Sequence, residues 1–510
     1  MKINKTSFFK HQEEFEKSIV CNRSSAIFAI AYNKKKNINT QLIFLEYWSI
    51  KNKYNIPQCN VNLRNCDGKS VFKFSYLIKK SSSNVIDLKK LIPENILSNL
   101  SNEFSNFDFI GTIEVEFLSN FDLKVAYPAV ICRYFSDNWH TSFHTSQRIM
   151  NKLSGDLFQK NQTQYINEGN ILLNFKKNIE AILIITNGTQ SIMSQKAELL
   201  VEGNNKSEKF EFELPPFKPY QIRILEITKI IGSRLDGWLK DSLYATVRFV
   251  LSNDIFPRMI YGLLDKENGD LSLDHTNFGK SESSDLDVFK SSGGSYDLLY
   301  SLPSTPWIDV LTEIHLPPSY PQGNYELNIE SLDFVYKENH CISFENKSKI
   351  DFQNKSLPCA ISYENAILPR RFHTTFIYKV KKSDLYGFFT DGPLPRNSKL
   401  PGFRWAPFWV NENQSYIQIA PRSFSKNIKK NFDILIKLYS ERGFHGEFFL
   451  KIPLSDDFII DSNFLERNFD DIDKSLTLLW ITFSYGKENN VPVFQYISRR
   501  KNSICVDHAF

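Results

Sequence analysis

Residues 257–276 read PRMIYGLLDKENGDLSLDHT, a proline-led apolar run that is followed by a histidine beside a small or hydroxyl residue. Three further stretches have the same layout, and the histidine stands 15 to 18 residues after the proline in all four. The stretches are 128–145, 257–276, 358–374 and 492–509, and their histidines are His144, His275, His373 and His508. Self-similarity at long period is the signature of tandem modules. The sequence therefore predicts one structural unit repeated along the chain.

The repeated unit is predicted to consist of β-strands. The chain has 43 Phe and 22 Tyr, and aromatic residues suit pleated, half-buried surfaces. Residues 209–214 alternate strictly, with Phe210, Phe212 and Leu214 on one face, and similar runs recur with turn signals between them. A chain of 510 residues is also too long for one core. We expect an all-β fold of three to four tandem antiparallel β-sandwich-like modules with short helical inserts.

Composition and the repeat divide the chain into four modules. We expect module 1 over residues 1–160, module 2 over 161–280, a degenerate module 3 over 296–400 and module 4 over 401–510. Residues 281–295 are rich in Ser, Gly and Asp and cannot bury enough apolar surface to order themselves, so a flexible linker is predicted there.

Module 2 carries a resemblance to a known family. The residues concerned are Ile184-Ile185-Thr186-Asn187-Gly188, the two strands predicted after them, Leu214-Pro215-Pro216, Ala245-Thr246-Val247 and Pro257. In this order of parts module 2 resembles the small all-β domain of sensory rhodopsin transducer proteins, and many immunoglobulin-like sandwiches share it. The resemblance covers roughly a fifth of the chain. It implies that such modules act as binding or signalling partners, although fold does not imply function.

Charge and cysteine content exclude several classes of protein. The net charge of +5 comes from 62 basic and 57 acidic residues with no long basic run, which does not favour nucleic-acid binding. Seven cysteines without a CxxC pair indicate reduced thiols. No signal peptide and no apolar run of about 20 residues is present, so we expect a soluble cytoplasmic protein without a membrane span. A surface or virion location would need a route other than Sec secretion.

Two interpretations of the repeated histidines are open. We expect His275, His373 and His508 to be structural, each hydrogen-bonding the backbone of its own module, because separate modules would place the copies far apart. Neutral imidazole is also a common metal ligand, and Asp274 and Asp507 precede two of the histidines, as a carboxylate that fixes a tautomer would. A metal site needs three or four ligands around one ion. We predict no metal.

Aromatic clusters are the predicted binding residues. Residues 403–409 read FRWAPFW, and a third tryptophan, Trp139, lies in the polar stretch 136–142. Aromatic side chains beside Arg hold sugar rings and dominate protein interfaces. The candidate binding residues are Trp139, His140, His144, Arg404, Trp405, Phe408 and Trp409. The alternative is that each cluster is an aromatic core strand.

No catalytic motif is present. The chain lacks G-x-S-x-G, HExxH and the glycine-rich phosphate-binding motifs, so no catalytic residue and no cofactor is predicted. The leading function is a non-catalytic binding or assembly protein that recognises a glycan or a protein through loop aromatics and strand edges, with homo-oligomerisation as a secondary prediction. One alternative is a carbohydrate-active enzyme with carboxylate or His-metal chemistry between modules. Another is a virion or surface structural protein.

Overall fold

The computed structural model describes residues 21–52, 56, 58–103, 107–120, 123, 129–144, 148–152, 163–174, 176, 178–203, 206–232, 234, 243–252, 255–256, 258–278, 288–290, 296–302, 305, 307, 309–315, 324–329, 332–336, 341–344, 357–364, 367–369, 374–391, 394–395, 403–410, 412, 414–420, 431–453, 457–469, 472, 476, 478–486, 493–501 and 503–508. Antiparallel strands dominate these residues and the helices among them are short, so the predicted all-β, multi-module fold class is confirmed. None of the helices described is long and apolar enough to cross a membrane.

Each module contributes eight principal strands. Module 1 has β1 (Cys21–Ala31), β2 (Asn39–Leu45), β3 (Gln58–Arg64), β4 (Ser70–Leu77), β5 (Ser83–Asp87), β6 (Phe109–Leu118), β7 (Ile131–Phe135) and β8 (His140–Phe143). Module 2 has β10 (Thr163–Leu173), β11 (Ile179–Thr186), β12 (Gln195–Gly203), β13 (Lys206–Leu214), β14 (Ile222–Glu226), β15 (Leu243–Ser252), β17 (Ile260–Asp265) and β18 (Leu271–His275). Module 3 has β21 (Tyr296–Leu302), β22 (Val310–His315), β23 (Asn324–Ile329), β24 (Leu332–Tyr336), β25 (Cys341–Phe344), β26 (Leu357–Glu364), β28 (Thr374–Val380) and β29 (Tyr386–Asp391). Module 4 has β31 (Phe403–Trp409), β32 (Ser415–Ala420), β33 (Asn431–Ser440), β34 (Gly443–Pro453), β35 (Phe458–Asp461), β36 (Leu478–Tyr485), β37 (Val493–Arg500) and β38 (Ser503–His508).

Shorter elements decorate these modules. The additional strands are β9 (Arg148–Lys152), β16 (Ile255–Phe256), β19 (Asn277–Phe278), β20 (Val288–Lys290), β27 (Ile367–Pro369) and β30 (Leu394–Pro395). The helices are α2 (Tyr47–Asn52), α3 (Leu88–Leu91), α4 (Glu94–Glu103), α5 (Ile227–Ile231) and α6 (Ser462–Asn468). Strand β20 pairs with β27 inside the segment predicted as a flexible linker, and the rest of residues 281–295 lies outside the described residues.

All four modules have one topology. In each, the first, third, fourth and sixth strands form an outer sheet in the order 4-3-6-1, and the others form an inner sheet in the order 5-2-7-8. Module 3 follows the same rule, so it is a full copy in topology. The prediction that Pro358 is equivalent to the prolines of the other modules is nevertheless wrong. Pro358 lies in the sixth strand, β26, whereas the runs after Pro128, Pro257 and Pro492 enter the seventh strand. His373 lies outside the described residues.

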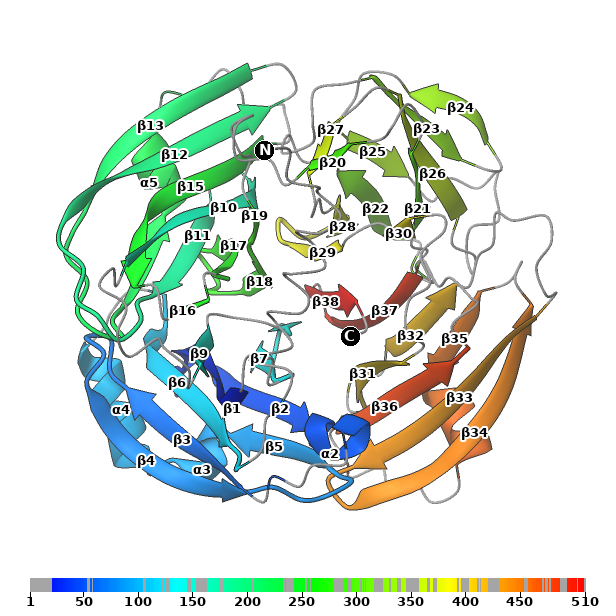
Figure 1. The fold of residues 1–510 in the computed structure, drawn as a ribbon, viewed down its shortest axis with the longest axis horizontal. Helices are drawn as coiled ribbons and strands as arrows, with labels where there is room; N and C mark the ends of the chain where they lie inside the picture. Colours follow the sequence, from blue (N-terminus) through cyan, green and yellow to red (C-terminus); the bar gives the residue numbers. More distant parts are fainter. Residues whose placement is uncertain are drawn as a thin grey trace, which may run out of the picture.

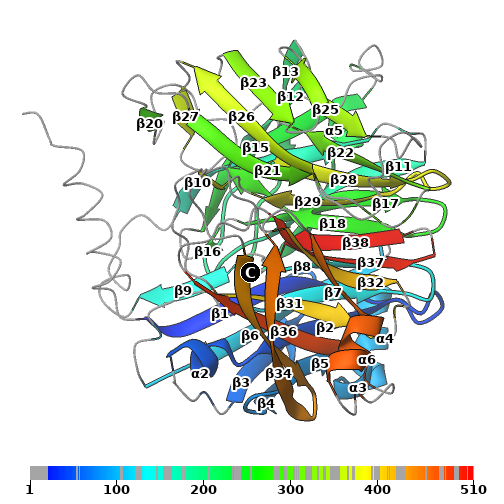
Figure 2. The same cartoon turned by 90° about the vertical axis from the view of Figure 1, so that its right-hand side faces the viewer.

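The four modules stand in a ring around a central axis (Figure 1). The eighth strands face this axis, and each contacts its neighbours in the cyclic order β8, β18, β29, β38 and back to β8. Figure 2 shows these strands stacked near the middle of the molecule. The contacts join Thr141 to Leu273, Ser272 to Tyr386, Gly387 to Ile504 and Ser142 to Cys505. Modules that are distant in sequence, the first and the last, therefore meet directly.

The inner strand β11 is apolar on both faces because each face packs in a different core. Strand β11 is buried along its whole length. Ala181, Leu183 and Ile185 pack inside the sandwich of module 2, whereas Ile182 and Ile184 pack in the core of module 1. A strand buried on both sides reads as a continuous apolar run and not as an alternation. The ring thus accounts for the ILIIT run of residues 182–186.

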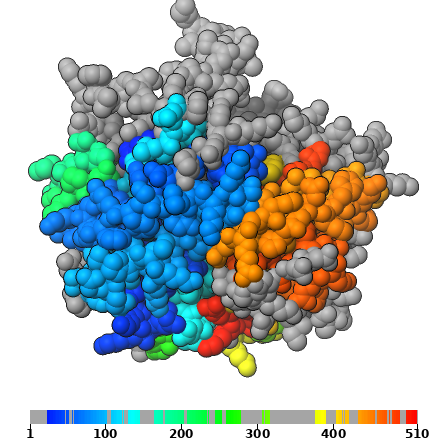
Figure 3. Space-filling model, turned by 90° about the horizontal axis from the view of Figure 1, so that it is seen from below, coloured from blue at the N-terminus to red at the C-terminus, as the bar shows by residue number. Residues whose placement is uncertain are grey.

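The junction of modules 1 and 4 has its own apolar cluster. Side chains of β2 and of the segment before β7 pack against β31, β33 and β36 of module 4. The cluster contains Ile43, Leu45, Ala129, Ile131, Trp405, Trp409, Tyr439, Leu478 and Trp480. Figure 3 shows the two modules side by side on one face of the molecule, module 1 in blue and module 4 in orange. Modules 1 and 4 are not consecutive in the chain, so side-chain packing at this junction closes the ring.

Candidate metal centre

The predicted aromatic binding residues are core residues. Trp139, Trp405, Phe408 and Trp409 are buried, and Arg404 is half-buried. The expectation that they lie exposed in loops is wrong. Trp405 and Trp409 stand on β31 and pack against module 1, Phe408 packs in the core of module 4, and Trp139 packs in the core of module 1. Trp405 stacks on Trp480 with ring centres 4.8 Å apart. The alternative interpretation, an aromatic core strand, holds for this cluster.

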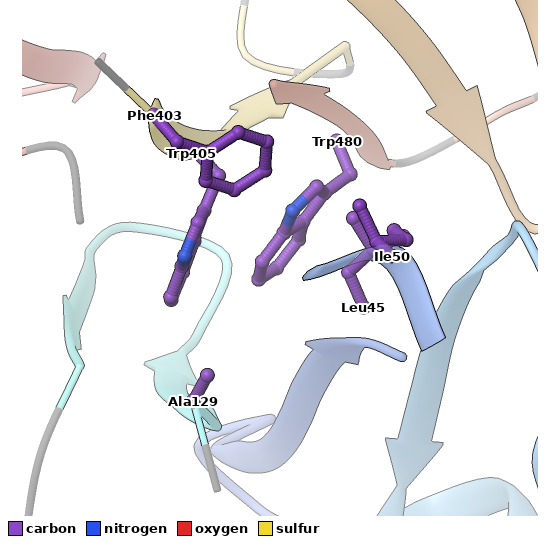
Figure 4. Close-up of a pocket in the computed structure, with 6 residues that line it drawn as sticks. All are labelled: Leu45, Ile50, Ala129, Phe403, Trp405 and Trp480. Atoms are coloured by element: carbon purple, nitrogen blue, oxygen red, sulfur yellow. The ribbon is translucent and has the colours of Figure 1, made fainter. Parts of the chain in front are cut away.

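A small apolar cavity lies beside this tryptophan pair (Figure 4). Its lining residues are Leu45, Ile50, Ala129, Phe403, Trp405 and Trp480. Its volume is about 10 Å³, which is about the space that a single water molecule needs. A sugar ring does not fit there, and the lining offers no polar surface to hydrogen-bond one.

His140 belongs to a buried polar network at the junction of modules 1 and 4. Its Nδ1 lies 3.2 Å from Arg133 Nη2, and its Nε2 lies 3.0 Å from Ser498 Oγ. Arg133 also donates to Glu412 Oε1 over 2.8 Å, and Arg500 Nε donates to Glu412 Oε2 over 3.0 Å. Burial, with the nearby Arg133 and Arg500 charges, holds the pKa of His140 well below its usual value. His140 is therefore a neutral part of the junction and does not reach a ligand site.

Three of the four histidines of the repeat come together, and the fourth, His373, lies outside the described residues. The ligand nitrogens of His144, His275 and His508 all lie within 4.8 Å of one another. The ring centre of His144 is 4.7 Å from that of His275 and 4.6 Å from that of His508. The expectation that separate modules place the copies far apart is wrong for these three. Each stands at the end of an eighth strand, and the ring brings the ends of these strands to one axis.

The histidine has the same place in the pairing of the seventh and eighth strands in modules 1, 2 and 4. His275 is paired with Ile260 and His508 with Gln495, each of which stands three residues after the proline of its repeat. His144 directly follows β8 in the same relation to β7. In module 3 the eighth strand ends at Asp391, which pairs with Thr374. The three described histidines thus come from modules 1, 2 and 4.

His275 is held as a neutral imidazole. Its Nδ1 lies 3.0 Å from the carbonyl oxygen of Thr276, so Nδ1–H donates there and the lone pair stands on Nε2. Burial is the largest cause that holds the pKa of His275 well below its usual value, and the neighbouring His144 and Arg258 add to it. Among the described residues Nε2 has no hydrogen-bond partner, and Asp274 Oδ1 lies 3.9 Å from it. A buried nitrogen with an unused lone pair is costly unless something binds it.

The carboxylates before two of the histidines have a shared backbone role. Asp274 Oδ1 accepts the backbone N–H of His275 at 2.7 Å, and Asp507 Oδ1 accepts that of His508 at 2.8 Å. Asp507 makes a second contact, since its Oδ2 lies 3.0 Å from His144 Nδ1. A carboxylate that accepts the Nδ1–H of an imidazole leaves Nε2 able to bind a metal, which is the usual outer-shell arrangement of metal sites.

Behind His275 lies a polar group that the sequence did not indicate. Thr276 donates from Oγ1 to Glu168 Oε2 at 2.6 Å, and Arg258 donates to the Thr276 carbonyl and to Asn277 Oδ1. Burial raises the pKa of Glu168 to about 7. No motif marks Glu168 in the sequence, because it stands in β10 and meets Thr276 only through the fold of module 2.

The three imidazoles fit a transition metal. Zinc–nitrogen distances are about 2.0–2.1 Å, so three nitrogens on one tetrahedral ion are about 3.4 Å apart. Side-chain shifts of about 1 Å bring the present nitrogens to that spacing from within 4.8 Å. Imidazole ligands suit Zn, Cu, Fe and Ni, whereas Mg and Ca prefer oxygen. Three potential metal ligands therefore lie close together, although no metal was predicted from the sequence.

Comparisons with known proteins do not indicate a function for this site. No protein-family model matches the chain, and no curated protein matches it. Among solved structures the chain is similar to dimeric latent PorU from Porphyromonas gingivalis, at 8% sequence identity and a TM-score of 0.13. The match covers 74% of this chain and 31% of that chain, so this chain spans about a third of its length. So low a TM-score carries no argument, and the transducer resemblance of module 2 stays a prediction.

Proposed function

We propose that this protein binds one transition-metal ion on the axis of its ring, through Nε2 of His275 together with His144 and His508. The observation that carries the proposal is the convergence of three imidazoles from three modules around the buried lone pair of His275. In two of the three, His275 and His144, Nδ1 lies 3.0 Å from a hydrogen-bond acceptor. Metal-bound histidines usually have such an acceptor at the nitrogen that does not bind the metal.

Three protein ligands leave a coordination position for water or a small molecule. Zinc sites with this ligand count are catalytic more often than structural, because a structural zinc has four protein ligands. A metal-bound water at such a position has a lowered pKa and is a nucleophile near neutral pH. His-metal chemistry between modules is thus the alternative function that the geometry supports, with hydrolysis as the reaction class. The side chains of His144 and His508 are 12% and 18% exposed, so the site is reached from solvent on their side.

Cobalt titration of metal-free protein tests the proposal. Co²⁺ bound by three imidazoles gives a visible absorption band, and we expect saturation at one ion per chain. His275→Ala should weaken binding at least 100-fold. His445→Ala is the matched control, because His445 lies on β34 and bonds to Ser440 Oγ at 2.6 Å, away from the axis. Wild-type protein that shows no saturable band, or equal affinity in the two variants, would contradict the proposal.

Partner binding through a strand edge is a second proposal. Strand β34 is the last strand of its sheet among the described residues, and it exposes Phe444 by 50% and Phe449 by 57%. An open edge strand with exposed aromatics readily pairs with another chain. The partner would be a protein or a second copy of this chain. Light scattering of wild-type protein and of Phe449→Lys tests the second copy, and identical monomeric masses would refute it. Glycan recognition stays a prediction, and the aromatic residues predicted to hold a sugar, Trp139, Trp405, Phe408 and Trp409, are buried.

A further inference from the structure

We propose that Asp507 is the positioning residue of the metal centre, because it sets the tautomer of His144 across the junction that closes the ring. The inference rests on the proposed metal-binding function. Its consequence is that the three-histidine site is complete only when module 4 is docked on module 1. Asp507 touches no metal itself and acts through His144.

The carboxylate of Asp507 has a fixed orientation. It stands on β38 with its side chain 2% exposed, so water does not compete for its oxygens. The backbone N–H of His508 donates to Oδ1 at 2.8 Å, and this bond directs Oδ2 toward module 1. Oδ2 then accepts from His144 Nδ1 at 3.0 Å. An imidazole whose Nδ1–H is held in this way presents the lone pair of Nε2.

The contact depends on the ring being closed. His144 follows β8 in module 1, and Asp507 lies on β38, more than 350 residues later in the chain. Nearby contacts fix the position of β8 against module 4, since Ser142 Oγ lies 3.0 Å from Tyr496 Oη on β37 and 3.0 Å from Cys505 Sγ on β38. A shift of β38 along β8 would move Oδ2 out of reach of Nδ1.

The equivalent histidine of module 2 is positioned differently. His275 donates from Nδ1 to the carbonyl of Thr276, its own neighbour in sequence, at 3.0 Å. Asp274, the counterpart of Asp507, meets the ring of His275 only at 3.9 Å, on the Nε2 side. The orientation of His275 is therefore set inside module 2, whereas that of His144 is set by another module. This difference makes Asp274 a matched control for Asp507.

Asp507→Asn is the discriminating variant. Its carbonyl oxygen can keep the bond from the His508 N–H, which leaves an NH₂ group facing His144 Nδ1. His144 must then accept at Nδ1 and carry its proton on Nε2, where a metal cannot bind. Loss of an outer-shell partner of this kind typically weakens metal affinity about 10–100-fold. We expect that loss for D507N in Co²⁺ titration, and less than about threefold for D274N, because His275 keeps its Thr276 carbonyl.

Two further measurements separate a positioning role from a structural one. ¹⁵N NMR of the imidazoles in metal-free protein should show the Nδ1–H tautomer for His144 in wild type and the Nε2–H tautomer in D507N. In the His144→Ala background, D507N should cause no further loss of Co²⁺ affinity, because its effect acts through His144. Thermal unfolding of each metal-free variant reports whether it is folded.

The outcomes are distinguishable. Wild-type protein that binds no Co²⁺ contradicts the proposed function. If wild-type protein binds Co²⁺ and the affinity of D507N is within twofold of it, the proposed role of Asp507 is overturned and the metal site is still supported. An Nε2–H tautomer of His144 in metal-free wild type also overturns it, and this result needs no variant to fold. A full loss in D507N that persists in the His144→Ala background overturns it as well.

Discussion

Neutralising Glu412 should open the junction between modules 1 and 4. The side chains of Glu412 and Arg133 are 4% and 6% exposed, and Arg133 Nη2 donates to Glu412 Oε1 at 2.8 Å. Glu412 also accepts from Arg500 at the same junction. Burial lowers the pKa of Arg133 to about 10, so this residue stays charged at neutral pH. Glu412→Gln keeps the shape of the side chain but leaves two guanidinium charges without a carboxylate.

The expected cost follows from the burial of the pair. Removing one partner of a buried ion pair typically costs about 3–5 kcal/mol, because the remaining charge is left uncompensated away from water. Exposed pairs contribute about 1 kcal/mol or less. Lys437 and Glu447 form such a pair at 3.1 Å with side chains 36% and 54% exposed, so Glu447→Gln is the matched control. We expect a loss of about 3–5 kcal/mol for E412Q and about 0.5 kcal/mol for E447Q.

Tryptophan fluorescence during urea unfolding measures the loss of stability at the junction itself. Trp405, Trp409 and Trp480 all lie in the apolar cluster of the junction, so their emission reports its opening. Comparing two variants at the same urea concentrations avoids relying on a single two-state free energy for a chain of several modules. A loss below about 1 kcal/mol in E412Q, or one no larger than in E447Q, would refute the claim that this pair holds the ring closed.

Two other predictions follow from the contacts around the axis. His140 has a pKa well below its usual value of about 6.5, so below pH 6.5 the unfolded chain takes up a proton that the folded chain does not. Stability should therefore fall by up to about 2 kcal/mol between pH 6.5 and pH 5, and His140→Gln should remove that part of the fall in urea titrations at the two pH values; an unchanged pH dependence would speak against it. A Cβ at Gly387 would lie 2.5 Å from the carbonyl oxygen of Ile504, so Gly387→Ala should force β29 away from β38 and cost about 1–3 kcal/mol. Gly486→Ala is its control in thermal unfolding, since a Cβ there meets no atom within 4 Å, and equal effects of the two changes would rule out a close approach of these strands.

Much of the local structure was predictable from residue patterns. Alternation at Phe210, Phe212 and Leu214 predicts a strand, and β13 covers these residues. Recurrence of the proline-led run and its histidine predicts a repeated unit, and modules 1, 2 and 4 place that histidine at the end of the eighth strand. Both signals are local, because a strand needs only its own side-chain period and a repeat needs only its own spacing.

Exposure of the aromatic stretch 403–409 was predicted wrongly for a physical reason. A run such as FRWAPFW reads the same whether its second face meets solvent or another module. Module 1 covers that face, and it reaches β31 only because the chain turns back on itself over four modules. An apolar run indicates that both faces of a strand are covered, but it does not show whether a distant module or a binding partner covers the second face.

Taken alone, the sequence determines that the chain is a series of β-rich modules and that a histidine recurs at one position of the repeat. Whether those histidines lie apart or together was decided by the tertiary structure, because a row of modules separates equivalent positions and a ring brings them to its axis. The pairing of Asp507 with His144, across more than 350 residues, is decided in the same way. Spacing along a chain specifies a side chain's place within its own module, and closure of the ring specifies which other modules it meets.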